Sequence, residues 1–425
     1  MQTALPLSAT SRREQDVAVY LAGAAAILTV VSIAAFEILM GLALVALLVS
    51  KQRLRFPPLL VPFGLFVLGT LASVAASGHA RAGLPQVKKL YLYLLLALIV
   101  STVRNMVQVR AIALGWALAA SLSSAWGLEQ FVRKYRAAEQ AHKDFYLSYI
   151  ADRITGFMGH WMTFSGHMMM ALLIITAIVF FSSDRHGTAW LIAGGAVIGA
   201  GLIVAETRSM WLGAAVGGVY LVCFYRRWVV LAVPAALALL LLANPFELRN
   251  RALSIYRPHG EVDSNAHRAV TRRVGWEMVK AHPWLGLGPE QIGPQFEQYI
   301  PADVPRPLPD GYYGHLHNIY LQFAAERGVP TMLALMWMLG QALLDFARAL
   351  RRLERSRRAG DEGRDDAGGG ARWMLHAAIA VTISILVAGF FEYNLGDSEV
   401  LAMFLAVLGC GYVAVGSVKP DSRAV

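Results

Sequence analysis

"DGYYGHLHNIYLQFAAERGVPTMLALMWMLGQALLDFA" (310–347) leads from a polar, aromatic, glycine-rich stretch with two histidines into a long apolar run. That run has the length of a membrane-spanning helix, which needs ~20 mostly apolar residues. Similar runs recur along the 425-residue chain, in which 56% of the residues are hydrophobic and 16% are charged. A soluble domain carries roughly 25% charged residues. We therefore predict an all-α integral membrane protein, with residues 1–425 forming one polytopic membrane domain.

The apolar runs predict about twelve transmembrane helices. Helices are expected because lipid offers no partners for backbone N–H and C=O groups, and the sequence lacks the alternating pattern of a membrane barrel. The first two runs merge near residues 33–37, which leaves about eleven as the alternative count. The predicted spans are 17–33, 35–50, 57–77, 89–102, 111–131, 161–182, 188–205, 210–225, 229–244, 329–347, 374–392 and 399–417.

Basic residues between the spans predict the orientation. Lys and Arg concentrate in cytoplasmic links, and with the N-terminus inside every inner link is basic, among them the loop 348–373. Both termini are then cytoplasmic, and one large loop, 245–318, lies on the outer side. Arg81, Lys88 and Lys89 fit this orientation less well, because it places them outside.

The large outer loop is expected to form a small cap rather than an independent domain. Asp263 and Ser264 are suitable N-caps for a helix through Trp276 and Met278. "HPWLGLGP" (282–289) predicts a turn that interrupts the helical pattern. The stretch 299–314, which contains four prolines, predicts irregular structure.

The net charge of +10 has a membrane explanation. In a protein with many spans, basic loops and contacts with anionic lipids or phosphates are the common causes, so nucleic acid is not expected as a partner. The two cysteines fall in apolar spans, which predicts neither a disulfide nor a cysteine metal site. The large loop offers no catalytic carboxylate pair, because its acidic residues are scattered: Glu290, Glu297, Asp303 and Asp310.

Arg208 is the first candidate functional residue. In "AETRSMWLG" (205–213) it lies between two apolar spans with almost no link around it. A guanidinium so close to the hydrocarbon boundary is costly unless it is paired or faces a polar cavity. One interpretation is an anion clamp, since Arg binds phosphate oxygens through two parallel N–H donors. The alternative is a snorkelling side chain paired with Glu206.

Three arginines of the large loop are the next candidates. Arg268, Arg272 and Arg273 lie in "AHRAVTRRVGW" (266–276). Positions 268 and 272 share one face of a helix, where two like charges repel mildly unless an anion lies between them. An anion site is one interpretation, and a solvated basic face is the other.

The quoted stretch contributes His315 and His317. A helix is expected to start near His317 or Asn318, and the free N–H groups of its first turn would favour an anion. A histidine there has an ordinary pKa of about 6.5 and suits the role of a base. The alternatives are a structural histidine and a metal site, but no third ligand is apparent in the sequence.

Taken together, these motifs resemble one family. An Arg between two spans ("ETRSMW") is followed by "RRVGW", then "PWLGLG", then the pattern H-N-x-Y-L-Q-x-x-x-E-x-G at the entry to the next span. The chain from Arg153 to about Asp397 is similar to the O-antigen ligase and O-antigen polymerase superfamily of bacterial inner-membrane glycosyltransferases. "RITGFMGHWMTFSGH" (153–167) resembles the family's Arg-x-x-Gly segment but has His160 and Trp161 where a Pro-Asn pair often stands.

The resemblance implies a GT-C-like helical enzyme of the inner membrane whose active site faces the periplasm. Such an enzyme moves a glycan from an undecaprenyl-diphosphate carrier to an acceptor, which for ligases is lipid A–core, and it uses no metal or other cofactor. Membrane lipids are its remaining expected partners. The alternatives are the O-antigen polymerase, whose acceptor is another lipid-linked repeat, and the protein O-oligosaccharyltransferase. A lipid or sugar-phosphate transporter is less favoured, because the chain shows no related halves.

Residue roles follow from this resemblance together with charge chemistry. A departing diphosphate needs positive charge, which placed arginines supply. We expect His317 to be the base that activates the acceptor hydroxyl in an inverting attack. The residues expected to bind the diphosphate or the glycan are Arg208, Arg272, Arg268, Arg273, Arg153, His315, Asn318 and Tyr320.

Overall fold

The computed structural model describes residues 9–226, 228, 242, 264–358 and 370–418, and within them every regular element is helical. The first part of the bundle consists of α1 (Ala9–Leu28), α2 (Ile33–Val49), α3 (Leu60–Ala76), α4 (Ala80–Lys88), η1 (Lys89–Leu92), α5 (Tyr93–Thr102), α6 (Met106–Gln140), α7 (Phe145–Ala151), α8 (Trp161–Phe181), α9 (Thr188–Val204) and α10 (Arg208–Arg226). The second part consists of α13 (Ser264–Ala281), α14 (Ile292–Gln295), η4 (Phe296–Tyr299), α15 (Ile319–Arg327), α16 (Val329–Arg358), α17 (Ala371–Ala388), η6 (Asn394–Gly396) and α18 (Ser398–Ser417). This part of the chain is therefore all-α, as predicted.

Six helical segments of the described chain are long and apolar enough to cross a membrane: Ala80–Thr102, Met106–Gln140, Trp161–Phe181, Val329–Arg358, Ala371–Ala388 and Ser398–Ser417. Shorter apolar helices accompany them at Asp16–Leu28, Ile33–Val49, Leu60–Ala76 and Thr188–Val204. Each predicted span overlaps one of these helices or α10, apart from 229–244, of which the structure describes only Leu242. The apolar helices support a membrane protein, while the number of spans and their orientation stay predictions.

The break between the first two helices is set by a cap. Ser32 precedes α2, and its side chain accepts a hydrogen bond from the backbone N–H of Ala35. A serine at this position satisfies one of the free N–H groups at a helix start. The two merged apolar runs of the sequence are therefore two separate helices.

Small residues bring α10 and α17 together. A Cβ on Gly213 would lie 2.9 Å from the carbonyl oxygen of Ser384, and a Cβ on Gly217 would lie 3.1 Å from that of Ala380. The Ser384 hydroxyl donates a hydrogen bond of 2.8 Å to the carbonyl oxygen of Gly213. Glycines four residues apart permit such close backbone approach between membrane helices. This contact fixes the start of α10 relative to the end of α17, where the candidate site lies.

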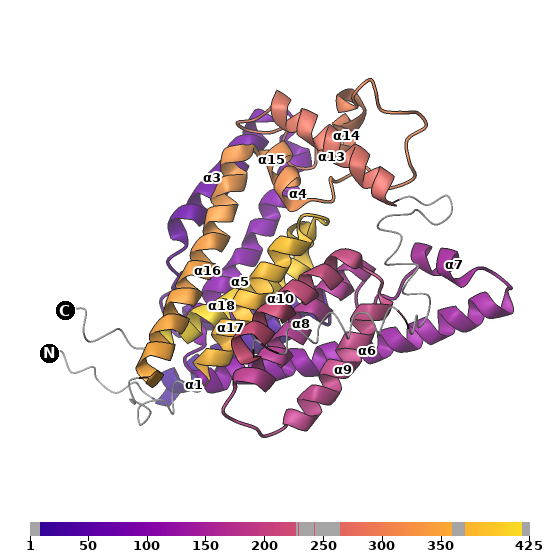
Figure 1. The fold of residues 1–425 in the computed structure, drawn as a ribbon. Helices are drawn as coiled ribbons and strands as arrows, with labels where there is room; N and C mark the ends of the chain where they lie inside the picture. The colour runs from indigo at the N-terminus through magenta and orange to yellow at the C-terminus, as the bar shows by residue number, and fades with distance from the viewer. Residues whose placement is uncertain (1–8, 227, 229–241, 243–263, 359–369, 419–425) are drawn as a thin grey trace.

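Helices α13 and α14 cover one end of the bundle beside α15 (Figure 1). The predicted helix through Trp276 and Met278 is α13, which begins at Ser264, while Asp263 lies outside the described residues. An apolar cluster beneath it includes Val274 and Met278 and is completed by Ala325 of α15. The cap thus shares its core with a helix of the bundle.

The basic segment after the tenth predicted span is partly helical. Helix α16 continues through Arg355 to Arg358, so the start of the predicted loop 348–373 extends this helix beyond its apolar part. Residues 359–369 lie outside the described residues.

Candidate active site

The polar entry stretch is held at both of its ends. Asn318 is the N-cap of α15, which confirms the predicted helix start, and its side chain accepts from the N–H of Leu321. On the other side, the Leu316 N–H donates to Gln322 Oε1 at 2.8 Å. Between these anchors His317 adopts φ +50, a left-handed conformation that is uncommon outside glycine. The hydrogen bonds of Asn318 and Leu316 on either side therefore fix the backbone from which the His317 imidazole projects.

The prediction of free N–H groups at the start of α15 is wrong for Ile319 and Leu321. The Ile319 N–H donates to the carbonyl oxygen of Gly389 at 2.8 Å. The Leu321 N–H donates to the side chain of Asn318 at 2.9 Å. Since these donors are used inside the protein, the helix start docks α15 on the end of α17 rather than presenting an open anion site.

Asn318 and Tyr320 serve this same docking. The Asn318 amide donates to the carbonyl oxygen of Phe390 at 3.0 Å. The Tyr320 hydroxyl donates to the carbonyl oxygen of Leu386 at 2.8 Å. Both predicted substrate-binding residues thus connect α15 to the segment around the end of α17, which fixes the position of His317.

The far end of α15 explains the glycine-rich turn 282–289. The Leu287 N–H donates to the carbonyl oxygen of Ala325 at 2.8 Å, so the turn satisfies a carbonyl that the helix end leaves open. Gly328 follows with φ +81, and a Cβ there would lie 2.0 Å from the carbonyl oxygen of Trp284. The turn and the helix end can approach so closely because this position is glycine.

The centre of the site is a three-residue polar chain. The Nδ1 atom of His317 lies 3.3 Å from Oε2 of Glu392. The other oxygen of Glu392, Oε1, accepts a hydrogen bond from the Arg268 guanidinium, with which Glu392 forms an ion pair. The three residues come from the start of α15, the link after α17, and α13. One carboxylate therefore holds both a histidine and an arginine of the predicted site.

Glu392 is charged in this setting. Burial alone would raise the pKa of its carboxyl, but the charge of Arg268 and the hydrogen bond with His317 outweigh it and lower the pKa to about 2. Only 8% of the Glu392 side chain is exposed, compared with 25% for Arg268. A buried carboxylate needs such partners, because removing it from water is costly.

Two more histidines surround His317. The ring of His315 lies 4.1 Å from that of His317, centroid to centroid, and the ring of His267 lies 5.2 Å from it. Burial lowers the pKa of His315 to about 3 and that of His267 to about 4, with His317 acting in the same direction. His267 also contacts the carbonyl oxygen of Tyr312 through Nε2 at 3.1 Å. Near neutral pH both neighbours are therefore uncharged rings against His317.

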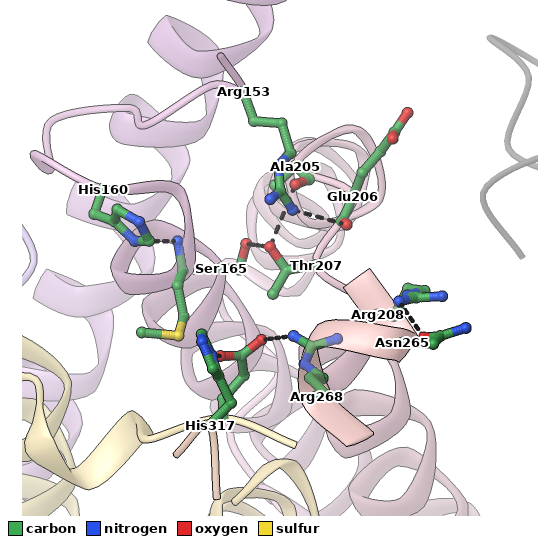
Figure 2. A network of polar contacts seen from close by, with 12 residues as sticks. Arg153, His160, Ser165, Ala205, Glu206, Thr207, Arg208, Asn265, Arg268 and His317 are labelled. Carbon is green, nitrogen blue, oxygen red and sulfur yellow. Dashed lines mark hydrogen bonds and ion pairs between the residues drawn. The ribbon is translucent and has the colours of Figure 1, made fainter. Parts of the chain in front are cut away.

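Arg208 reaches the same face of α13 that carries Arg268 (Figure 2). It opens α10, and its Nη2 donates to Asn265 Oδ1 at 3.0 Å. Asn265 and Arg268 are three residues apart on α13, so they are neighbours on one side of that helix. The structure thereby brings two predicted anion-binding arginines to one place.

Arg153 lies near this group, across from His317 in Figure 2. Its Nη1 donates to the carbonyl oxygen of Glu206 at 3.2 Å, and its guanidinium lies 4.5 Å from the centroid of the Trp161 ring. Trp161 opens α8, where the sequence departs from the family pattern. The aromatic ring supplies a flat surface on which the guanidinium stacks, so this departure gives Arg153 a definite partner.

The other two arginines of α13 are separate from the central chain. On the exposed side of the cap, Arg273 forms an ion pair with Asp303, in which its Nη2 lies 2.7 Å from each carboxylate oxygen. Arg272 is exposed, and its Nε donates to the carbonyl oxygen of Arg268 at 3.3 Å. The structure thus places Arg272 one turn from Arg268 and directs Arg273 elsewhere.

Glu392 and His267 are the site residues that the sequence reasoning missed. Glu392 is the last residue of the predicted span 374–392. Its charge at a span end, on the same predicted side as the large loop, could have marked it as a candidate site residue. His267 precedes Arg268 in the motif already singled out. Among the described residues, no group of His, Cys, Asp and Glu is arranged to hold a metal ion.

These features define a helical, membrane-type protein with a basic, histidine-rich site at the ends of apolar helices. Residues 193–336 match the family model of the O-antigen ligases. The match includes Arg208, α13 and His317, and it supports the O-antigen ligase superfamily for this chain. No curated protein matches the chain.

Proposed function

We propose that the chain is an O-antigen ligase. It transfers polysaccharide from undecaprenyl diphosphate to lipid A–core at the periplasmic face of the inner membrane, with inversion and without a metal. The family match supports a transferase of the ligase and polymerase type in general. The proposal depends mainly on one observation, the contact between Nδ1 of His317 and the buried carboxylate of Glu392.

The contact with Glu392 selects one tautomer of His317. An ionised carboxylate only accepts hydrogen bonds, so Nδ1 of His317 is the donor. In the neutral imidazole Nε2 then carries the lone pair, and Nε2 is buried without a hydrogen-bond partner among the described residues. A histidine oriented by a carboxylate, with its second nitrogen ready to accept a proton, has the geometry of a general base.

The transfer step forms one bond at the anomeric carbon and breaks another. The acceptor hydroxyl oxygen attacks the anomeric carbon and gives its proton to Nε2 of His317. The bond from that carbon to the diphosphate breaks, and its electron pair leaves with the diphosphate. Direct displacement inverts the anomeric centre. Because Nε2 is buried in this structure, the acceptor has to displace side chains to reach it, and the rings of His315 and His267 pack against the His317 ring.

Arginines supply the charge that the leaving diphosphate requires. Arg208 contacts Asn265, which is a neighbour of Arg268 on one face of α13, and Arg272 lies one turn further along this face. We assign the diphosphate to this face, with Arg153 at its edge. Positive groups fixed in advance stabilise the transition state more than the ground state, because negative charge on the diphosphate grows as the bond breaks. Arg273 is given no contact with the diphosphate, since it pairs with Asp303 on the exposed side of the cap and takes no part in the chain from Arg268 to His317.

A complementation experiment tests the proposal. His317→Ala is expressed in a strain that lacks its own ligase, and attachment of polysaccharide to lipid A–core is measured at matched protein levels. The matched control is His282→Ala, because His282 lies in the same cap but is exposed, and its ring contacts Tyr299 rather than the central chain. Loss of attachment in the first variant and retention in the second is expected. Full attachment with His317→Ala contradicts the base role.

The same experiment separates ligase from polymerase, since the superfamily contains both. Loss of a ligase leaves long polymer on the lipid carrier, detached from core. Loss of a polymerase leaves core that carries single repeats. A core with single repeats in the deletion strain would assign the polymerase activity instead.

A further inference from the structure

A second basic site lies at the other ends of α10 and α17, which border the first site. A cavity of about 450 Å³ is lined by Phe224, Leu350, Arg351, Glu354, Arg355, Arg358, Arg372 and His376. These residues come from the last turn of α10, the end of α16 and the start of α17. Helix α17 has 18 residues, which at ~1.5 Å per residue span ~27 Å. The cavity and the candidate active site are thus separated by roughly the ~30 Å thickness of a bilayer core.

The charges of the cavity do not cancel. Its lining contains four arginines and one glutamate, which gives a net charge of +3. Arg372 is paired with Glu354 at 2.7 Å. Arg351, Arg355 and Arg358 have no carboxylate partner among the described residues. They are spaced four and three residues apart on α16, so they share one face of the helix and repel one another unless an anion lies between them.

The inner wall of the cavity is held by contacts of Arg372 and His376. The Arg372 guanidinium lies 5.1 Å from the centroid of the Phe181 ring. The buried His376 stacks on the same ring at 3.9 Å, and its Nδ1 is 3.1 Å from the hydroxyl of Tyr220. These contacts hold Arg372 in one position at the back of the cavity.

One wall of the cavity is apolar and open. Phe224 is 57% exposed, and it lies in the last turn of α10. An exposed aromatic ring beside several arginines suits a ligand with an anionic head and an apolar tail. Guanidinium groups bind phosphate oxygens through paired N–H donors.

We propose that this cavity binds the phosphate of an anionic glycerophospholipid. Arg351, Arg355 and Arg358 contact the phosphate oxygens, and the acyl chains pass along Phe224. The site is independent of the transferase proposal, because it shares no residue with it. The same chemistry accepts a soluble phosphate ester, so the test includes both sources.

Binding is measured on the purified full-length protein in detergent by native mass spectrometry. Phosphatidylglycerol and the zwitterionic phosphatidylcholine are titrated separately, and glycerol 3-phosphate and inorganic phosphate are added as competitors. Each basic residue near an anionic lipid contributes ~1 kcal/mol, or about fivefold in affinity. We therefore expect Arg351→Gln/Arg355→Gln to weaken phosphatidylglycerol binding by about 25-fold.

The matched control is Arg352→Gln/Arg357→Gln. These arginines lie on the same part of α16 and are exposed, but they do not line the cavity. The same loss of charge there should change binding by no more than about twofold, because only the general surface field is reduced. Arg351→Lys/Arg355→Lys keeps the charge, removes the paired donors, and provides a second variant if the first folds poorly.

The outcomes decide the proposal. Selective loss in the cavity variant, with no effect of the soluble phosphates, supports the lipid as the ligand. Displacement of the lipid by glycerol 3-phosphate or inorganic phosphate supports the phosphate site with a soluble source. Equal loss in the cavity and control variants, or equal binding of the two lipids by the wild-type protein, overturns it.

Discussion

Replacement of Glu392 by Gln tests the chain of contacts from Arg268 to His317. The substitution keeps the size of the side chain and removes its charge, so Arg268 loses its ionic partner. A carboxyl pKa of about 2, against an ordinary value of 4.5, corresponds to ~3 kcal/mol in favour of the charged form. Breaking a buried ion pair by removing one partner costs ~3–5 kcal/mol in other proteins. We therefore expect Glu392→Gln to lower the free energy of unfolding by ~3 kcal/mol at pH 7.

The assay is unfolding of the purified protein in detergent, with exposed and buried pairs compared. Glu297→Gln is the matched control. Glu297 also pairs with an arginine, Arg306, at 2.7 Å, but both side chains of this pair are more than half exposed. That solvent-exposed pair should contribute little to stability. In the double variant Arg268→Met/Glu392→Gln, no unpaired charge remains, so the loss should be smaller than the sum of the two single losses.

The pH dependence gives an independent check. Because the pKa of Glu392 is lower in the folded protein, its contribution is complete above about pH 4.5 and is lost as the pH falls toward 2. The difference between wild type and Glu392→Gln should shrink over this interval. Strictly additive single losses, or a Glu392→Gln protein as stable as wild type at pH 7, would contradict a stabilising ion pair between Glu392 and Arg268.

Three further predictions concern separate features. Gly328→Ala places a Cβ 2.0 Å from a backbone oxygen at φ +81 and should cost more than ~1 kcal/mol in thermal unfolding, whereas Gly218→Ala, with nothing within 4 Å, should be neutral or stabilising. The lowered pKa values of His315 and His267 mean that the unfolded chain takes up protons first, so the melting temperature should fall as the pH drops from 6.5 toward 4; a constant melting temperature there contradicts their burial as neutral rings. Arg208→Lys keeps the charge without the paired donors and should lose most transfer activity at an unchanged melting temperature, and wild-type activity would favour the snorkelling alternative.

The helices and their ends were largely predictable because the information is local. A capping residue and an apolar pattern within a few positions predicted the start of α15 at Asn318 and the course of α13. The break before α2 depends on Ser32, which stands inside a run that is apolar on both sides. Apolarity alone hid that boundary, and only the cap reveals it.

The partners inside the site were not predictable in the same way. Glu392 contacts His317 across 75 positions and Arg268 across 124 positions of the sequence. Such pairs arise when the ends of α15, α17 and α13 meet, which depends on helix packing and not on spacing along the chain. The hydrogen bond of the Ile319 N–H was not predictable for the same reason, because its partner Gly389 belongs to another segment, whereas the Leu321 N–H has a local partner in the Asn318 side chain.

The most direct test of His317 as the general base is the transfer rate of purified His317→Ala with saturating lipid-linked donor and lipid A–core. A positioned general base contributes ~10²–10⁴-fold to a rate. If His317 is the base, the transfer rate falls within this range, while donor binding changes by only a few-fold and the melting temperature is retained. A His317→Ala protein that transfers glycan at the wild-type rate would contradict that role.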